Sequence, residues 1–159
     1  MKYVDTKVVF REVPDEVTLA INISNCPVKC PGCHSSYLTQ DIGEILNEES
    51  LGRLINGNIG ITCVSFMGGD SEPQSVYRLA KWIKTEHPEL KTSWYSGRSL
   101  SMAAQNLEVL DFVKVGPFIE EYGPLDSPAT NQRFYRISHK EDGGTELTDL
   151  TKAFYSKTL

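Results

Sequence analysis

Three cysteines lie within eight residues of one another, in the stretch NCPVKCPGCH at residues 25–34. Cys26, Cys30 and Cys33 have the spacing C-x-x-x-C-x-x-C, and His34 follows the last of them. Thiols this close together serve in covalent haem attachment, dithiol redox chemistry, structural zinc sites and iron–sulfur clusters. The remaining residues of the chain have to distinguish these four chemistries.

The haem and dithiol interpretations both leave one thiol without a role. Residues 30–34 match the haem pattern C-x-x-C-H, but covalent attachment normally follows export, and the pattern does not use Cys26. A dithiol centre would use only Cys30 and Cys33, and a third cysteine nearby would invite scrambled disulfides. It would also be followed by a long helix, whereas residues 22–40 are rich in polar residues, Gly and Pro.

Zinc is the main non-catalytic alternative, because a structural zinc site needs four ligands. His34 directly follows Cys33, and two adjacent residues have difficulty reaching the same tetrahedral ion. Cys63 is the other candidate for a fourth ligand, but it lies in an apolar run typical of a buried thiol. A zinc-binding interaction module therefore stays an alternative interpretation, although the fourth ligand would have an unfavourable geometry.

An iron–sulfur cluster uses all three thiols and requires no fourth. A [4Fe–4S] cluster normally takes four cysteines, so three cysteines leave one iron with an open coordination position. A loop with Pro27, Pro31 and Gly32 suits this role, because Pro restricts the backbone and Gly admits turns that other residues resist.

The segments after the cysteines alternate between strand and helix patterns. We expect strands at residues 16–24, 60–69, 90–97, 111–118 and 133–138, and helices at residues 49–55, 75–87 and 101–110. Residues 118–132 are expected to be a long loop, and residues 139–147 a turn. The alternation predicts an α/β fold with a parallel sheet, in a single domain of residues 1–159.

Three of the expected strands end in loops that could form a binding site. The first runs into the cysteines, the second ends in Gly68, Gly69 and Asp70, and the third ends beside Ser96. Ligands of parallel α/β folds bind at the carboxyl ends of the strands. We therefore expect these loops to share one rim.

Composition narrows the class of protein. The chain has 159 residues, of which 40% are apolar and 23% charged, with a net charge of −5 and a pI of about 5.2. Scattered basic residues in an acidic chain disfavour a nucleic-acid-binding surface. No apolar run approaches ~18 residues and no signal peptide pattern is seen, so we expect no membrane partner and a cytoplasmic location with reduced thiols.

The sequence resembles a known group of enzymes. The spacing of Cys26, Cys30 and Cys33 after a first strand, with Gly68-Gly69-Asp70 after a second, is similar to the two signatures of the radical S-adenosylmethionine superfamily. This resemblance implies a small partial (βα) barrel, with a mostly parallel open sheet and helices on the outside.

The resemblance is closest to the activating proteins of anaerobic (class III) ribonucleoside-triphosphate reductases. The short chain, the Gly-Gly-Asp motif and the stretch from residue 111 to Asn131-Gln132-Arg133 are similar to that family, over about residues 19–136. Three details depart from the pattern. Gly32 stands where many members have an aromatic residue, His34 stands where a Tyr is frequent, and Ser71-Glu72 separate the Gly-Gly-Asp motif from Pro73.

The resemblance also implies a set of ligands and an activity. It assigns Cys26, Cys30 and Cys33 to the [4Fe–4S] cluster, whose open iron binds S-adenosyl-L-methionine. The residues expected to bind the cofactor are Gly32, Cys33, His34, Gly68, Gly69, Asp70 and Ser96. The implied enzyme is an oxidoreductase that cleaves the cofactor reductively to a 5′-deoxyadenosyl radical, with no residue of the chain acting as a catalytic acid or base.

The implied substrate is another protein. The radical would abstract a hydrogen from a glycine Cα of the anaerobic ribonucleotide reductase catalytic subunit, and a low-potential donor such as flavodoxin or ferredoxin would supply the electron. Two alternatives remain: an activase of another glycyl radical enzyme, similar to that of pyruvate formate-lyase, or the non-catalytic zinc module.

Overall fold

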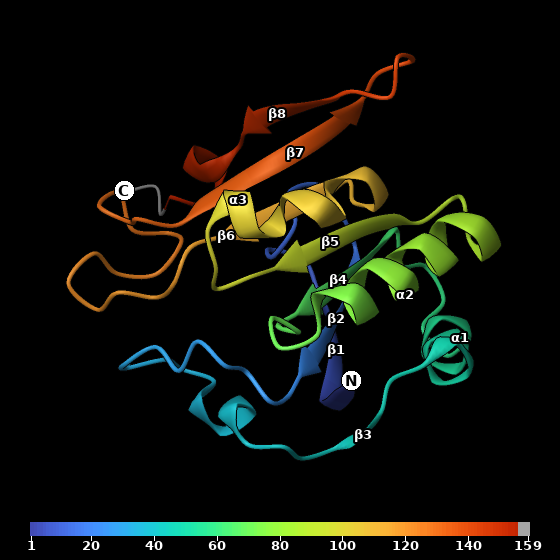
Figure 1. The fold of residues 1–159 in the computed structure, drawn as a ribbon, viewed down its shortest axis with the longest axis horizontal. Coiled ribbons are helices and arrows are strands. Elements are labelled where there is room, and N and C mark those ends of the chain that lie inside the picture. The colour runs from blue at the N-terminus through green and yellow to red at the C-terminus, as the bar shows by residue number, and fades with distance from the viewer. Residues whose placement is uncertain (156–159) are drawn as a thin grey trace.

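The chain folds around one sheet of eight strands, in the order β3-β1-β2-β4-β5-β6-β7-β8 (Figure 1). The computed structural model describes residues 1–155. The strands are β1 (Lys2–Val9), β2 (Thr18–Ile23), β3 (Glu44–Ile45), β4 (Cys63–Met67), β5 (Lys91–Tyr95), β6 (Phe112–Val115), β7 (Arg133–His139) and β8 (Thr145–Asp149).

The described residues also contain three α-helices and three short 3₁₀ helices. The α-helices are α1 (Glu48–Asn56), α2 (Pro73–Glu86) and α3 (Leu100–Ala103), and the 3₁₀ helices are η1 (Ser36–Thr39), η2 (Ala104–Val109) and η3 (Thr151–Phe154). The helix expected at residues 101–110 is present, with α3 as its first turn and the 3₁₀ helix η2 as the rest.

The sheet is mixed, which corrects the expectation of a mostly parallel sheet. Strands β2, β4, β5 and β6 pair in parallel, but β1 and β3 join one edge antiparallel, and β7 and β8 join the other in the same way. The expected strands of the centre are all present, and β7 covers the expected strand at residues 133–138. Strands β1, β3 and β8 were not expected. The sheet of residues 1–155 stays open and forms no closed barrel.

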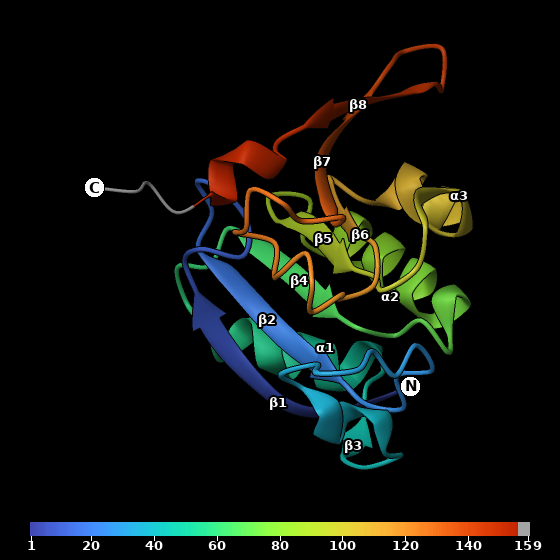
Figure 2. The same ribbon diagram turned by 90° about the vertical axis from the view of Figure 1, so that its left-hand side faces the viewer.

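The α-helices pack on one face of the sheet, and Figure 2 shows α1 behind β1 and β2. Helix α1 begins with a capping box between Asn47 and Ser50, and Pro73 lies at the first turn of α2. The main core lies between these helices and the sheet. Its largest fully buried side chains include Trp94, Phe66, Leu19 and Ile21 from the strands and Leu51, Leu79 and Ile83 from the helices.

The opposite face of the sheet has a smaller apolar cluster and a polar end. Val13, Cys63, Phe112 and Phe134 form the cluster. Because side chains alternate between the two faces of a strand, Lys114 shares this face with Phe112, whereas Val113 and Val115 face the main core. Lys114 lies toward the carboxyl end of β6, which is the end of the sheet that bears the cysteine loop.

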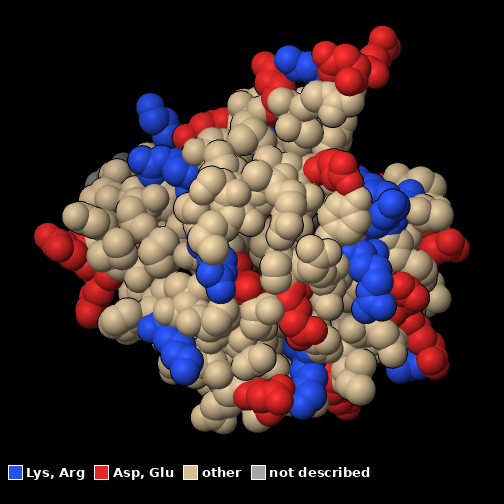
Figure 3. Space-filling model, viewed as in Figure 1, with Lys and Arg blue, Asp and Glu red and all other residues tan. Residues whose placement is uncertain are grey.

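Two surface properties bear on the classes of partner. None of the helices in residues 1–155 combines the length and the hydrophobicity that crossing a membrane requires. On the face drawn in Figure 3, basic side chains are interspersed with acidic ones, and this face has no broad area of one sign.

Candidate metal centre

The three clustered cysteines lie on a loop that leaves the carboxyl end of β2. The N–H groups of Asn25 and Cys26 donate to the carbonyl oxygens of Gln40 and Leu38, both at 2.9 Å, and close the neck of this loop. Asn25 and Lys29 have positive φ angles of 61° and 50°. We call residues 25–40 the cysteine loop, and its shape depends on backbone hydrogen bonds and tight turns.

All three thiols of the cysteine loop are free and partly exposed, as ligands that receive a cluster from solution need to be. Within residues 1–155, no three His, Cys, Asp or Glu side chains are arranged to hold a single metal ion. A cubane cluster makes a different demand, because each thiolate binds a different iron. The donor set of three thiols therefore fits a [4Fe–4S] cluster in its chemistry.

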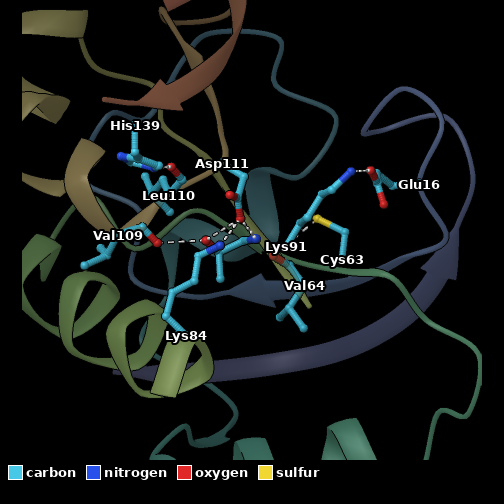
Figure 4. A network of polar contacts seen from close by, with 10 residues as sticks. Glu16, Cys63, Val64, Lys84, Lys91, Val109, Leu110, Asp111 and His139 are labelled. Atoms are coloured by element: carbon cyan, nitrogen blue, oxygen red, sulfur yellow. Dashed lines mark hydrogen bonds and ion pairs between the residues drawn. The ribbon is translucent and has the colours of Figure 1, made fainter. Parts of the chain in front are cut away.

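Cys63, the fourth cysteine, lies away from this loop. It begins β4 and is fully buried, next to the ion pair of Lys91 and Glu16 (Figure 4). The four residue steps from Cys63 to Met67, at the far end of the strand, span about 13 Å. Burial is the largest cause that raises the pKa of the Cys63 thiol. The prediction that Cys63 is a small buried hydrophobe is confirmed.

The structure brings two predicted site residues, Asp70 and Ser96, into direct contact. Both are buried, and the Ser96 hydroxyl donates to Asp70 Oδ1 at 2.5 Å. The N–H of Gly97 donates to Asp70 Oδ2 at 2.9 Å, and the N–H of Arg98 donates to Ser96 Oγ at 3.0 Å. The Asp70 carboxylate therefore fastens the loop after β5 to the loop after β4.

Gly68 and Gly69 make the tight turn that carries Asp70. Their φ angles are +109° and +92°, in the region that favours glycine. A Cβ atom on Gly69 would lie 2.7 Å from Val76 Cγ2, and one on Gly68 would lie 3.0 Å from the carbonyl oxygen of Ile23. The Gly68 carbonyl accepts from Trp94 Nε1 at 2.7 Å. Backbone conformation and close packing explain why both positions are glycine.

The cysteine loop packs against the loops that follow β5 and β6. A Cβ atom built on Gly97 would lie 3.0 Å from a methyl group of Val28. A Cβ atom on Gly32 would lie 3.5 Å from the side chains of Phe118 and Glu120. His34 is exposed, and the centroid of its ring lies 5.8 Å from that of Phe118. The expected common rim is therefore present.

Lys114 is part of this region and was missed by the sequence analysis. Its side chain is buried, and its Nζ donates to the carbonyl oxygens of Gly116 at 2.8 Å and of Ser96 at 3.5 Å. Burial lowers the pKa of Lys114 to about 8, although the charge of Asp70 and then those of Cys30, Cys33 and Cys26 act to raise it. The available signal was a lysine between Val113 and Val115, in the strand expected at residues 111–118.

The Asn131-Gln132-Arg133 stretch closes the long loop after β6. Asn131 Nδ2 donates to the carbonyl oxygen of Pro117 at 3.0 Å, and Gln132 Nε2 donates to that of Gly116 at 3.4 Å. The Arg133 guanidinium donates to the carbonyl oxygens of Thr130 and Gln132 at 2.8 and 2.7 Å. In this structure the three residues hold the base of the loop that places Phe118 beside the cysteines.

Comparison with known proteins identifies the family of the chain. The family described as a 4Fe-4S single cluster domain matches residues 16–137, which is more than half of the chain and includes the cysteine loop, Asp70, Ser96 and Lys114. No curated protein and no solved structure gives a significant match. The match agrees with the iron–sulfur chemistry that three free thiols on one loop can support, and the chain belongs to the 4Fe-4S single cluster domain family.

Proposed function

We propose that this chain is a radical S-adenosylmethionine enzyme that activates an anaerobic ribonucleotide reductase. Cys26, Cys30 and Cys33 would hold a [4Fe–4S] cluster, and the cluster would supply an open iron site for S-adenosyl-L-methionine. The observation that carries the proposal is the placement of these free thiols at the carboxyl ends of four parallel strands, in a chain of a [4Fe–4S] family. We read the central strands and the helices on one face as the partial barrel of that superfamily, in a single domain whose last residues, 156–159, lie outside the described part.

Each protein group has a role that its position supports. The turn at Gly68 and Gly69 brings backbone close to the methionine end of the cofactor, where a side chain would block it. Asp70, held by Ser96, fixes this turn to the next loop. The exposed ring of His34 and the half-buried ring of Phe118 lie together beside the third cysteine and offer a surface for stacking of the adenine.

When bound, the cluster supplies one electron to the sulfonium of the cofactor, which then yields methionine and the 5′-deoxyadenosyl radical. The chain itself orients the cofactor and keeps water away from it. No residue of the chain needs to accept or donate a proton. A glycine Cα of the reductase catalytic subunit gives up the hydrogen atom.

The partners and the location follow from this proposal. The electron comes from a low-potential donor such as flavodoxin or ferredoxin, and nucleic acid and membrane take no part. A chain with reduced thiols and an oxygen-sensitive cluster is expected to act in the cytoplasm.

The test is an anaerobic assay. The chain is reconstituted with iron and sulfide and given dithionite and S-adenosyl-L-methionine, and 5′-deoxyadenosine and methionine are measured. We expect both products in equal amounts, and their loss in Cys26→Ala, Cys30→Ala and Cys33→Ala. Cys63→Ala is the matched control, because it removes a buried thiol away from the cysteine loop, and it should keep its activity.

Two outcomes would replace the proposal. About one zinc per chain and no product would make the cysteine loop a structural zinc site. Product without a glycyl radical signal on the ribonucleotide reductase, but with one on a pyruvate formate-lyase-like enzyme, would change the partner and leave the chemistry in place.

A further inference from the structure

Lys114 is a buried cation for which the described residues offer no ionic partner. Its side chain is only 8% exposed, and no carboxylate of residues 1–155 forms an ion pair with it. Its two hydrogen bonds go to backbone carbonyl groups. A buried charge without a partner destabilises a fold, so Lys114 is expected to have a function that offsets this cost.

The position of Lys114 links it to the cysteine loop through two connections. Its ammonium bonds to the carbonyl of Ser96, directly before Gly97, against which Val28 of the cysteine loop packs. It also bonds to the carbonyl of Gly116, two residues before Phe118, which lies against Gly32 of the same loop. The ammonium therefore lies at the base of both segments that contact the cysteine loop.

Several ionisable groups lie close enough to Lys114 to influence its pKa. Besides burial, the groups that influence its pKa are Asp70, Cys30, Cys33 and Cys26, in that order. Asp70 accepts two hydrogen bonds, one on each oxygen, from the Ser96 hydroxyl and the N–H of Gly97, and both donors are uncharged. The Asp70 carboxylate and the three thiols of the cysteine loop are therefore the groups near Lys114 that can carry negative charge, and the thiols become thiolates when they bind a metal.

We propose that Lys114 is the buried counter-charge of the metal centre and that its ammonium raises the reduction potential of the cluster held by Cys26, Cys30 and Cys33. The inference rests on the proposed ligation by these three cysteines. A [4Fe–4S]²⁺ core with three thiolates has a net charge of about −1, and one electron from a reductant brings it to about −2. A fixed positive charge nearby stabilises the more negative state, and it does so strongly where water is excluded.

The test measures the potential without S-adenosyl-L-methionine, so it does not depend on radical chemistry. Wild type, Lys114→Met, Lys114→Gln and Lys114→Arg are reconstituted anaerobically, and iron and sulfide are counted. The reduced cluster is then followed by electron paramagnetic resonance during a potentiometric titration. Lys81→Met is the matched control, because Lys81 is an exposed lysine of α2 on the helix side of the sheet.

We expect the ratio of reduced to oxidised cluster at a fixed potential to fall at least tenfold in Lys114→Met and Lys114→Gln, which is a potential lower by about 59 mV for one electron. Lys114→Arg keeps the charge and should stay within threefold of wild type, as should Lys81→Met. Loss of the cluster from both folded neutral variants, with retention in Lys114→Arg, would also support the counter-charge.

Two results would overturn the inference, and they can be told apart. An intact cluster with the same ratio in Lys114→Met as in wild type would overturn the role of Lys114 and leave the proposed function standing. A wild-type chain that takes up no cluster, or one that keeps its cluster in Cys26→Ala, Cys30→Ala and Cys33→Ala, would overturn the proposed ligation and this inference together.

Discussion

Ser96 and Asp70 lie 26 residues apart in the sequence, yet the serine hydroxyl donates to the aspartate at 2.5 Å. The contact joins the loop after β4 to the loop after β5, and both side chains are buried. The N–H of Gly97 donates to the other carboxylate oxygen, so the Asp70 side chain holds two loops of the candidate site together.

Removing this contact should destabilise the protein without removing the cluster. In Ser96→Ala, Asp70 Oδ1 loses its hydroxyl donor and the N–H of Arg98 loses its acceptor, so we expect a loss of about 1–3 kcal/mol in the free energy of unfolding. Urea denaturation measures this loss. Iron and sulfide contents should match those of wild type, and a cluster-free Ser96→Ala chain that is still folded would contradict the assignment of the ligands.

Gly69 should tolerate alanine much less well than Gly60 does. Both have a positive φ, of +92° and +91°, but a Cβ atom at Gly69 would lie 2.7 Å from Val76, whereas at Gly60 nothing lies within 4 Å. Gly60→Ala should therefore cost only the backbone strain, about 1–2 kcal/mol. Gly69→Ala should lose a further 1–3 kcal/mol or so from overpacking.

Thermal or urea unfolding of these two variants separates the two costs. Equal destabilisation of Gly60→Ala and Gly69→Ala would show that packing against α2 does not restrict the turn that carries Asp70.

Cys63 should not react with alkylating reagents in the folded, metal-free protein. Burial holds its pKa above its ordinary value of 9.0, so the reactive thiolate does not form near neutral pH. Iodoacetamide should modify three thiols of the native chain, at positions 26, 30 and 33, and the fourth only after unfolding, as counted by mass spectrometry. Rapid modification of Cys63 in the native state would contradict its placement in the small apolar cluster.

The pH dependence of stability should report on Lys114 in the metal-free protein. Its folded pKa is about 8 and its ordinary value is 10.5. Between these values the unfolded chain binds a proton that the folded chain does not, so this group raises stability as the pH increases from 8 to 10.5. Below pH 8 the unfavourable contribution is fully present.

Lys114→Met removes this contribution and should be more stable than wild type at pH 7. The difference between the two should shrink by about 3 kcal/mol as the pH rises to 10.5. Urea denaturation at several pH values, with a reductant present, measures it. A difference that stays constant over this range would mean that the lysine titrates in the folded chain as it does in water.

Much of the fold was accessible from local patterns. The apolar spacing of Val76, Leu79, Ala80 and Ile83 predicted α2, and these side chains are all buried against the sheet. The apolar run at residues 60–69 predicted a strand, which is β4, and four of its five residues are buried. Such patterns can be recognised in a sequence because the buried positions of a helix or a strand repeat with a fixed period.

The antiparallel strands at the edges of the sheet could not be predicted from such patterns. Strand β8 is Thr145–Asp149 and has no fully buried side chain, so nothing in its sequence distinguishes it from a loop. It forms because β7 offers it a row of hydrogen-bonding partners, from Tyr135 to His139. Pairing between distant segments therefore made the sheet mixed where a parallel one was expected.

The candidate site likewise has features that short segments predict and features that depend on tertiary contacts. The sequence by itself determined the three closely spaced thiols, the glycine turn and the loops that follow the strands, because these are properties of short segments. Only the tertiary structure decided that Ser96 donates to Asp70, that Cys63 lies buried at the start of β4, and that Lys114 is buried with its ammonium on the carbonyl groups of Ser96 and Gly116. The physical reason is that contacts, burial and local charge depend on which strands are neighbours, and neighbours are set by pairing between residues far apart in the chain.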